Sequence, residues 1–142
     1  MHISTEGIKL IKDFEGLRTK PYICIGGYKT IGYGHLLSND DNREYISLEE
    51  AEELLYLDIN KAEDSVMRNI YIDLTQRQFD ALVSFTFNLG SAALQRSTLR
   101  QKINRNEHDQ VSKEFGRWVY ANGSIRAGLV KRRLIEAEMY GV

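Results

Sequence analysis

Three side chains near the N-terminus, a carboxylic acid, a thiol and a hydroxyl, could do chemistry together. Glu15 is followed after eight residues by Cys24, and Cys24 is followed after five more by Thr30. A positioned carboxylic acid can give a proton to a leaving group. A thiol or hydroxyl beside it can attack an electrophile or orient a water molecule. These roles require that the chain bring the three groups to one site.

Glu15 lies at the end of a predicted helix, in a position that favours its protonated form. Ser4 is a typical N-cap residue and Gly16 a typical stop, so a helix is predicted between them. Glu15 shares a face with Ile8 and Ile11, and the negative end of the helix dipole disfavours a carboxylate there. Partial desolvation acts in the same direction, so we expect a general acid. The alternative is a glutamate that turns into solvent or pairs with an arginine.

The placement of the other two groups depends on the register of a predicted hairpin over residues 22–30. Two adjacent glycines supply its turn. A two-residue loop would put Cys24 and Thr30 on opposite faces, because side chains alternate along a strand. A three-residue loop, with Tyr22 opposite Thr30, would put them on the same face. The sequence leaves both registers open, and Cys24 could also be a small apolar residue that fills the inner face.

Helix signals dominate the rest of the chain. A capping box over residues 47–50 begins a long helix that ends near Asn69. A second capping box over residues 75–78 begins an almost wholly apolar helix, typical of a buried one, which Gly90 closes. Short helices follow, and a last helix is predicted over residues 128–140.

These elements predict one predominantly helical α+β domain over residues 1–142. We expect a small N-terminal lobe with the β-hairpin at about residues 13–58. Helix 47–69 would connect it to a helical C-terminal lobe made of residues 1–12 and 70–142. The chain is long enough to bury a core without staples.

Composition narrows the classes of function. The single cysteine cannot form an internal disulfide, and no apolar run approaches the roughly 20 residues that cross a bilayer. The N-terminus does not resemble a signal peptide, so a cytoplasmic protein is expected. Residues 1–90 hold nine Lys or Arg and fifteen Asp or Glu, whereas residues 91–142 hold ten and five. The basic half could meet an anionic polymer, although it could equally form solvated helix faces.

The motif of Glu15, Cys24 and Thr30, followed by IGYGHLL, resembles that of the phage-type lysozymes, the endolysins of glycoside hydrolase family 24. Members of that family carry Asp, and sometimes Cys, at the position of Cys24. The segment QRQFDALVSFTFNLG is similar to the family's central buried helix. STLRQKIN and RWVYANG with GLVKRRLIEAE are similar to its C-terminal lobe. The resemblance covers nearly the whole chain and implies a lysozyme-like fold.

The resemblance implies a bacteriolytic glycoside hydrolase, a muramidase acting on the β-1,4 bond between N-acetylmuramic acid and N-acetylglucosamine in peptidoglycan. Glu15 would protonate the leaving oxygen, and Thr30 would hold a water or a group of the sugar ring. A free thiol titrates near 8.5, far above the value of about 3.9 for Asp. Cys24 could therefore act as base or nucleophile only if its pKa were depressed, and otherwise it would orient water.

Other residues are expected to support this site. Asp58 falls within the apolar stripe of the long helix and needs a counter-charge. We predict that it pairs with His35 and ties the hairpin lobe to that helix, with Arg68 or another basic residue as the alternative partner. By resemblance, the saccharide cleft would be lined by Leu36, Phe87 and Thr98.

One arginine among Arg117, Arg126, Arg132 and Arg133 is expected to pair with Glu15, but the sequence does not select it. No metal site or cofactor is required, and the pI of 6.3 with no recognition motif disfavours nucleic-acid binding. By resemblance, a monomer would accumulate in the host cytoplasm without stable membrane association. It would reach the cell wall after a holin permeabilises the membrane. The alternatives are a lytic transglycosylase and a wall-binding protein impaired in catalysis because Cys24 replaces Asp.

Overall fold

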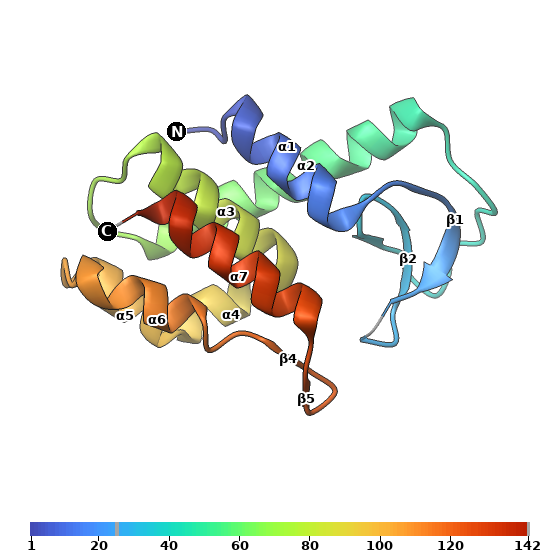
Figure 1. The fold of residues 1–142 in the computed structure, drawn as a ribbon. Helices are drawn as coiled ribbons and strands as arrows, with labels where there is room; N and C mark the ends of the chain where they lie inside the picture. The colour runs from blue at the N-terminus through green and yellow to red at the C-terminus, as the bar shows by residue number, and fades with distance from the viewer. Residues whose placement is uncertain (25, 142) are drawn as a thin grey trace.

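The computed structural model describes residues 1–24 and 26–141. The predicted α+β class is confirmed: a small antiparallel sheet lies at one end of a mostly helical molecule (Figure 1). None of the described helices is both long enough and apolar enough to traverse a membrane. The elements, in chain order, are α1 (Thr5–Glu15), β1 (Arg18–Ile23), β2 (Lys29–Gly32), β3 (His35–Leu36), α2 (Leu48–Asn69), α3 (Gln76–Leu89), α4 (Ser91–Arg96), α5 (Thr98–Asn104), the 3-10 helix η1 (His108–Gln110), α6 (Val111–Phe115), β4 (Tyr120–Ala121), β5 (Ser124–Ile125) and α7 (Ala127–Tyr140).

Helix α1 begins and ends where its capping residues predict. The Ser4 side chain accepts a hydrogen bond from the Gly7 amide, and Gly16 ends the helix with a φ of 68°. The backbone N–H of Gly16 donates to the Lys12 carbonyl, which completes the last turn. Glu15 is therefore the last helical residue and faces the sheet end of the molecule.

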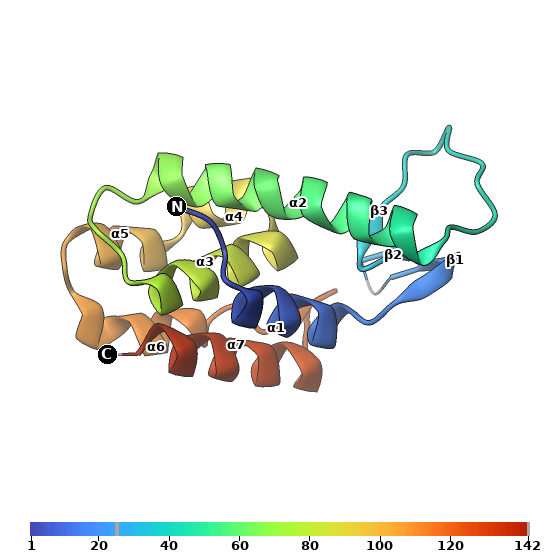
Figure 2. The same cartoon turned by 90° about the horizontal axis from the view of Figure 1, so that it is seen from above.

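Both predicted capping boxes are present. In α2, the Ser47 side chain accepts from the Glu50 amide while the Glu50 side chain accepts from the Ser47 amide. Thr75 and Gln78 make the same reciprocal bonds at the start of α3. These bonds satisfy amides that a helix start leaves without partners. Figure 2 shows α2 running from the sheet to the helical end of the molecule.

The apolar side chains form two separate cores. The smaller one holds the sheet against the start of α2 and consists of Ile31, Leu37, Ile46 and Ala51. The larger one is built around α3, whose residues 79–86 are all buried. All four residues of the small core lie within the predicted N-terminal lobe, residues 13–58. The boundaries of the two lobes stay a prediction. The buried members of the large core are Ile11, Leu55, Ile59, Ala62, Val66, Ile70, Phe79, Ala81, Leu82, Val83, Phe85, Leu94, Leu99, Ile103, Val111, Phe115, Met139 and Tyr140.

The hairpin adopts the register of the three-residue loop. Tyr22 lies opposite Thr30, and the Cys24 amide donates to the Tyr28 carbonyl over 3.0 Å. Gly27 supplies a φ of 85° in the turn. Residue 25, the first of the three predicted loop residues, lies outside the described residues. Cys24 and Thr30 consequently share a face of the sheet, as this register predicts.

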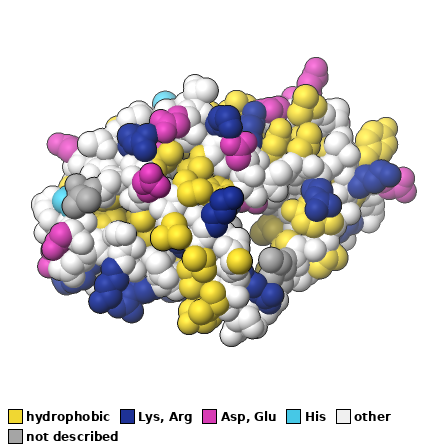
Figure 3. All heavy atoms as spheres, viewed as in Figure 1, with side chains coloured by type: hydrophobic (Ala, Val, Ile, Leu, Met, Phe, Trp, Pro, Cys, Tyr) yellow, Lys and Arg dark blue, Asp and Glu magenta, His cyan; other side chains and the backbone are white. Residues whose placement is uncertain are grey.

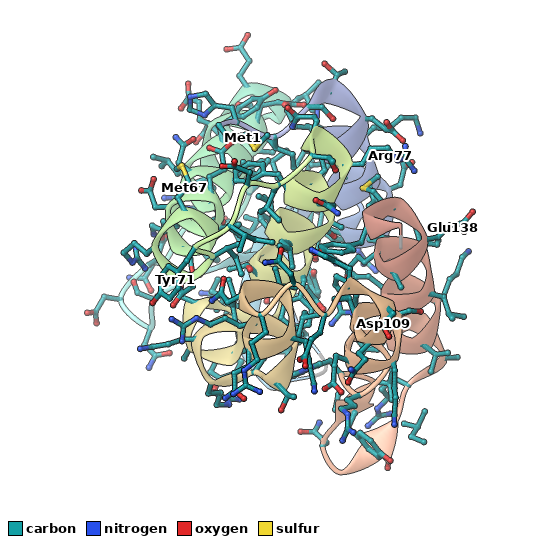
Figure 4. All side chains as sticks on the ribbon, turned by 90° about the vertical axis from the view of Figure 1, so that its left-hand side faces the viewer. Met1, Met67, Tyr71, Arg77, Asp109 and Glu138 are labelled. Carbon is teal, nitrogen blue, oxygen red and sulfur yellow. The ribbon has the colours of Figure 1, made fainter. Side chains whose placement is uncertain are left out.

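The N-terminal segment is fastened to α2 far from the sheet. The amide of Ile3 donates to Glu63 Oε2 over 2.7 Å, and Glu63 is only 3% exposed. The terminal amine of Met1 lies 3.9 Å from the sulfur of Met67, and Figure 4 shows the two residues close together on this side. This contact holds the start of α1, whose other end carries Glu15.

Candidate active site

A pocket of about 190 Å³ brings the three candidate catalytic side chains together. It lies where the end of α1, the β1–β2 hairpin and the end of α3 meet. An acid from the end of α1 and a thiol and a hydroxyl from the hairpin thus line one concave surface. The pocket is lined by Glu15, Tyr22, Cys24, Thr30, Gly34, Leu36, Phe87 and Asn88.

Glu15 is held by an arginine from the opposite end of the chain. Arg132 Nη1 donates to Glu15 Oε2 over 2.6 Å, and the Glu15 side chain is 17% exposed. The structure therefore selects Arg132 from the arginines considered. The free oxygen, Oε1, is the one available to a ligand.

Gly34 allows the close approach of the hairpin to Glu15. A Cβ atom at this position would lie 2.5 Å from Glu15 Oε1, so the Glu15 carboxyl group would have to move to admit any other residue here. Its φ of 74° also belongs to the region that favours glycine. The second glycine of the GYGH segment therefore has a steric role at the candidate acid.

Cys24 is half-buried and titrates more easily than an isolated thiol. Burial acts to raise the pKa of the Cys24 thiol, but hydrogen bonds from the Thr30 hydroxyl and from the nearby backbone outweigh it, so this pKa lies below the ordinary value of a thiol. The Thr30 hydroxyl also donates to the Tyr28 carbonyl over 2.9 Å. Because it has one proton, it can stabilise the thiolate only by turning away from that carbonyl.

A larger depression of about 320 Å³ adjoins the first pocket. The two share Gly34, Leu36 and Phe87, so two of the predicted cleft residues lie between them. Thr98, the third, lines a different pocket with Trp118. The structure thus brings Leu36 and Phe87, but not Thr98, to the surroundings of Glu15.

The predicted contact between His35 and Asp58 is present. His35 Nδ1 lies 2.7 Å from Asp58 Oδ2, and the two side chains are 23% and 21% exposed. The contact joins β3 to α2 on the wall of the larger depression. The partner of Asp58 in this bond is therefore His35 and not the alternative, Arg68.

Two residues near the pocket were not predicted from the sequence. Glu136 is 0% exposed, and its carboxylate lies beside Arg132 and Arg133. Asn88 lines the pocket, and its Oδ1 accepts from Arg133 Nη2 over 2.7 Å. The spacing of Arg132 and Glu136, four residues apart on a helix, was the available signal for the first.

The face of the molecule seen in Figure 3 carries side chains of mixed character. Figure 3 shows acidic and basic side chains distributed over the visible face, with hydrophobic ones gathered at its lower centre. Across residues 1–24 and 26–141, no three side chains of the His, Cys, Asp and Glu types come together as a metal ion would require.

Solved structures share this fold over almost the whole chain. The muramidase domain of SpmX from Asticaccaulis excentricus has a TM-score of 0.88 and 33% identity, with 100% of this chain and 99% of that chain covered. An endolysin from the Escherichia coli phage FAHEc1 has a TM-score of 0.87 and 34% identity, with 99% and 94% covered. The fold is therefore that of the lysozyme class of glycoside hydrolases.

The chain belongs to the phage lysozyme family, whose sequence model matches residues 12–136. The endolysin of Bacillus phage B103 is 46% identical over 99% of this chain and 54% of its own length. The endolysin of Bacillus phage PZA is 40% identical, and 55% of its length is covered. The chain thus spans about half the length of these two relatives. The endolysin of Acyrthosiphon pisum secondary endosymbiont phage 1 is 41% identical, with 99% of this chain and 98% of its own length covered.

Proposed function

We propose that this chain is an endolysin-type muramidase that hydrolyses the β-1,4 bond between N-acetylmuramic acid and N-acetylglucosamine in bacterial peptidoglycan. The observation that carries the proposal is the shared pocket of Glu15, Cys24 and Thr30 in a member of the phage lysozyme family. Support also comes from relatives named endolysin and muramidase.

Glu15 is the general acid in this proposal. Its Oε2 accepts a hydrogen bond from Arg132, so the transferable proton belongs on Oε1, the oxygen beside Gly34. Transfer of this proton to the glycosidic oxygen lets the bond to the anomeric carbon break through an oxocarbenium-like transition state. Partial exclusion of water by the pocket strengthens the electrostatic contribution of Glu15.

Cys24 and Thr30 act on the other side of the bond. As a thiolate, Cys24 takes a proton from a water molecule while the oxygen of that water bonds to the anomeric carbon. The proton taken by Cys24 balances the one that Glu15 gives to the leaving group. The lowered pKa of Cys24 supports this role, and Thr30 holds the water. Direct attack by the sulfur and simple orientation of water by the thiol are the alternative roles.

The remaining functional assignments form part of the same proposal. Leu36 and Phe87 contact the saccharide chain where the two depressions meet, and Thr98 contributes only if the polymer extends to its separate pocket. The protein works as a monomer without a cofactor. It accumulates in the host cytoplasm and reaches the wall after a holin opens the membrane.

The test compares the wild type with Glu15→Gln on purified peptidoglycan. We expect the variant to lose roughly a hundred- to ten-thousandfold in rate, the usual contribution of a general acid. Glu6→Gln is the matched control, because Glu6 lies on the same helix, where it pairs with Arg77 on the surface. Mass spectrometry of the wild-type products should find reducing ends.

Two outcomes would replace the proposal. Products ending in 1,6-anhydro-muramic acid would indicate a lytic transglycosylase, which needs an acid but no partner that activates water. Binding to peptidoglycan with no cleavage by the wild type would indicate a wall-binding protein that lacks catalysis.

A further inference from the structure

A buried carboxylate lies behind the candidate acid, on α7. Glu136 is 0% exposed and Arg133 is 1% exposed. Arg133 Nε lies 2.8 Å from Glu136 Oε1, a distance that makes an ion pair although the groups are not aligned as a hydrogen bond. The Ser84 hydroxyl donates to Glu136 Oε2 over 2.5 Å. Glu136 is thus desolvated, and all its polar contacts come from the protein.

Arg132 connects this carboxylate to Glu15. Its Nε donates to Glu136 Oε2 over 3.3 Å, while its Nη1 donates to Glu15 Oε2 over 2.6 Å. Its third nitrogen, Nη2, donates to the Ser84 carbonyl over 3.1 Å. The guanidinium is planar, so bonds on three sides fix both its position and its rotation.

The ring of Phe14 closes the remaining side of this guanidinium. Arg132 Cζ lies 5.0 Å from the centroid of that ring, and Arg132 is 4% exposed. One oxygen of Glu15 therefore meets a donor that cannot move unless the bonds around it break. Without Glu136, the Nε side of the guanidinium would have no anionic partner.

Stability alone is a weak reason for this arrangement. Desolvation of buried ions offsets most of their mutual attraction, so a buried ion pair is commonly no more stabilising than apolar residues of the same volume. Burial raises the pKa of Glu136, with Arg133 and Arg132 acting in the opposite direction. The network does, however, impose an orientation on the groups that it contacts.

We propose that Glu136 is a positioning residue that acts through Arg132 to fix the orientation of the Glu15 carboxyl group in the pocket. The inference rests on the proposed function, because orientation of Glu15 matters for rate only if Glu15 is the acid. Glu136 has no exposed surface and contacts no substrate. Its effect is therefore confined to the chemical step, where misplacement of a reacting group by about 1 Å can cost on the order of a hundredfold.

The first experiment separates kcat from KM for Glu136→Gln on a soluble peptidoglycan oligosaccharide. We expect kcat to fall roughly ten- to a hundredfold while KM changes less than about twofold. Glu63→Gln is the matched control, since Glu63 is also buried, at 3% exposed, but contacts His2 and Ile3 instead of the cleft. An equal fall of kcat in both variants, or an unchanged kcat in Glu136→Gln, overturns the inference.

A double-variant comparison tests whether Glu136 acts through Arg132. Arg132→Lys keeps the charge but offers a single ammonium, which cannot span both carboxylates as the guanidinium does. We expect Glu136→Gln to lower kcat by less than about twofold in that background, because the connection is already lost. Full additivity of the two losses contradicts the inference.

The third measurement does not depend on catalysis. At fixed pH, the carbon-13 NMR signal of the Glu15 carboxyl group should move in Glu136→Gln and stay in place in Glu63→Gln. A wild-type protein that cleaves no peptidoglycan overturns the proposed function by itself. An unmoved Glu15 signal in Glu136→Gln overturns the positioning role, whether or not the wild type is active.

Discussion

The two walls of the pocket are built differently. The helical wall presents Glu15, whose carboxylate is fixed by an arginine that is 4% exposed and backed by a carboxylate that is 0% exposed. The sheet wall presents Cys24 on a hairpin whose neighbouring residues Ile23 and Tyr28 are 67% and 64% exposed. A core of eighteen buried side chains supports the first wall, and a core of four supports the second.

The difference indicates which catalytic group needs a fixed geometry in the proposed reaction. A general acid must meet one oxygen atom of the bound polymer, so its orientation has a large effect on rate. A water molecule or a small thiol on the other side can adjust its position against the more exposed hairpin. The sheet wall can therefore carry a thiol, whose exact orientation has a smaller effect in the proposed reaction.

The largest expected difference lies between the ion pair behind the helical wall and the pair that joins the sheet to α2 beside the larger depression. Arg132→Met removes the arginine that pairs with Glu15 and one of the two arginines beside the buried Glu136, and it should lower the free energy of unfolding by about 3–5 kcal/mol. His35→Ala removes a pair whose groups are 23% and 21% exposed, and it should cost about 1 kcal/mol. Urea denaturation at pH 7 measures both values. Equal losses would show that the two walls are held with similar strength.

The next largest effect concerns the contact between the walls. Gly34→Ala puts a methyl group 2.5 Å from Glu15 Oε1, so we expect a loss of activity on the order of a hundredfold. The positive φ adds a stability cost of about 1–2 kcal/mol. Peptidoglycan hydrolysis and thermal unfolding of the same sample separate the two effects.

Gly123→Ala is the control for Gly34→Ala. Gly123 has a φ of 78° and no atom within 4 Å of the added methyl group. Its substitution should therefore reproduce the loss of stability without the loss of activity. If both variants lost activity equally, contact with Glu15 would not be the cause.

Features that depend on residues close together in the chain could be predicted from the sequence. The helix boundaries followed from caps such as Ser47 with Glu50, because the bonds join residues three apart in the chain. The pairing of Asp58 with His35 could be predicted because a carboxylate within an apolar stripe needs a partner, and few candidates lay nearby.

Other features required the tertiary structure. The hairpin register depends on which loop residues take positive φ, and two adjacent glycines allow more than one solution. The selection of Arg132 depends on how the tertiary structure brings α7 to the end of α1, since Arg132 and Glu15 are 117 positions apart. For Thr98, the resemblance supplied a cleft role, but the residue lies beside Trp118 in a separate pocket.

The smallest expected effect is a change in the pKa of Cys24, on the sheet wall, with little change in the free energy of unfolding. Thr30→Val removes the hydroxyl that favours the thiolate, while burial, which acts to raise the pKa of Cys24, remains. The pKa of Cys24 should therefore rise above its wild-type position, and the thiolate absorbance of the only cysteine reports it directly. In the wild type, the lowered pKa makes a contribution to stability that is present at alkaline pH and lost as the pH falls through the folded value. A pKa that stays in place in Thr30→Val would assign the shift to the backbone amides alone and leave Thr30 without influence on the thiol.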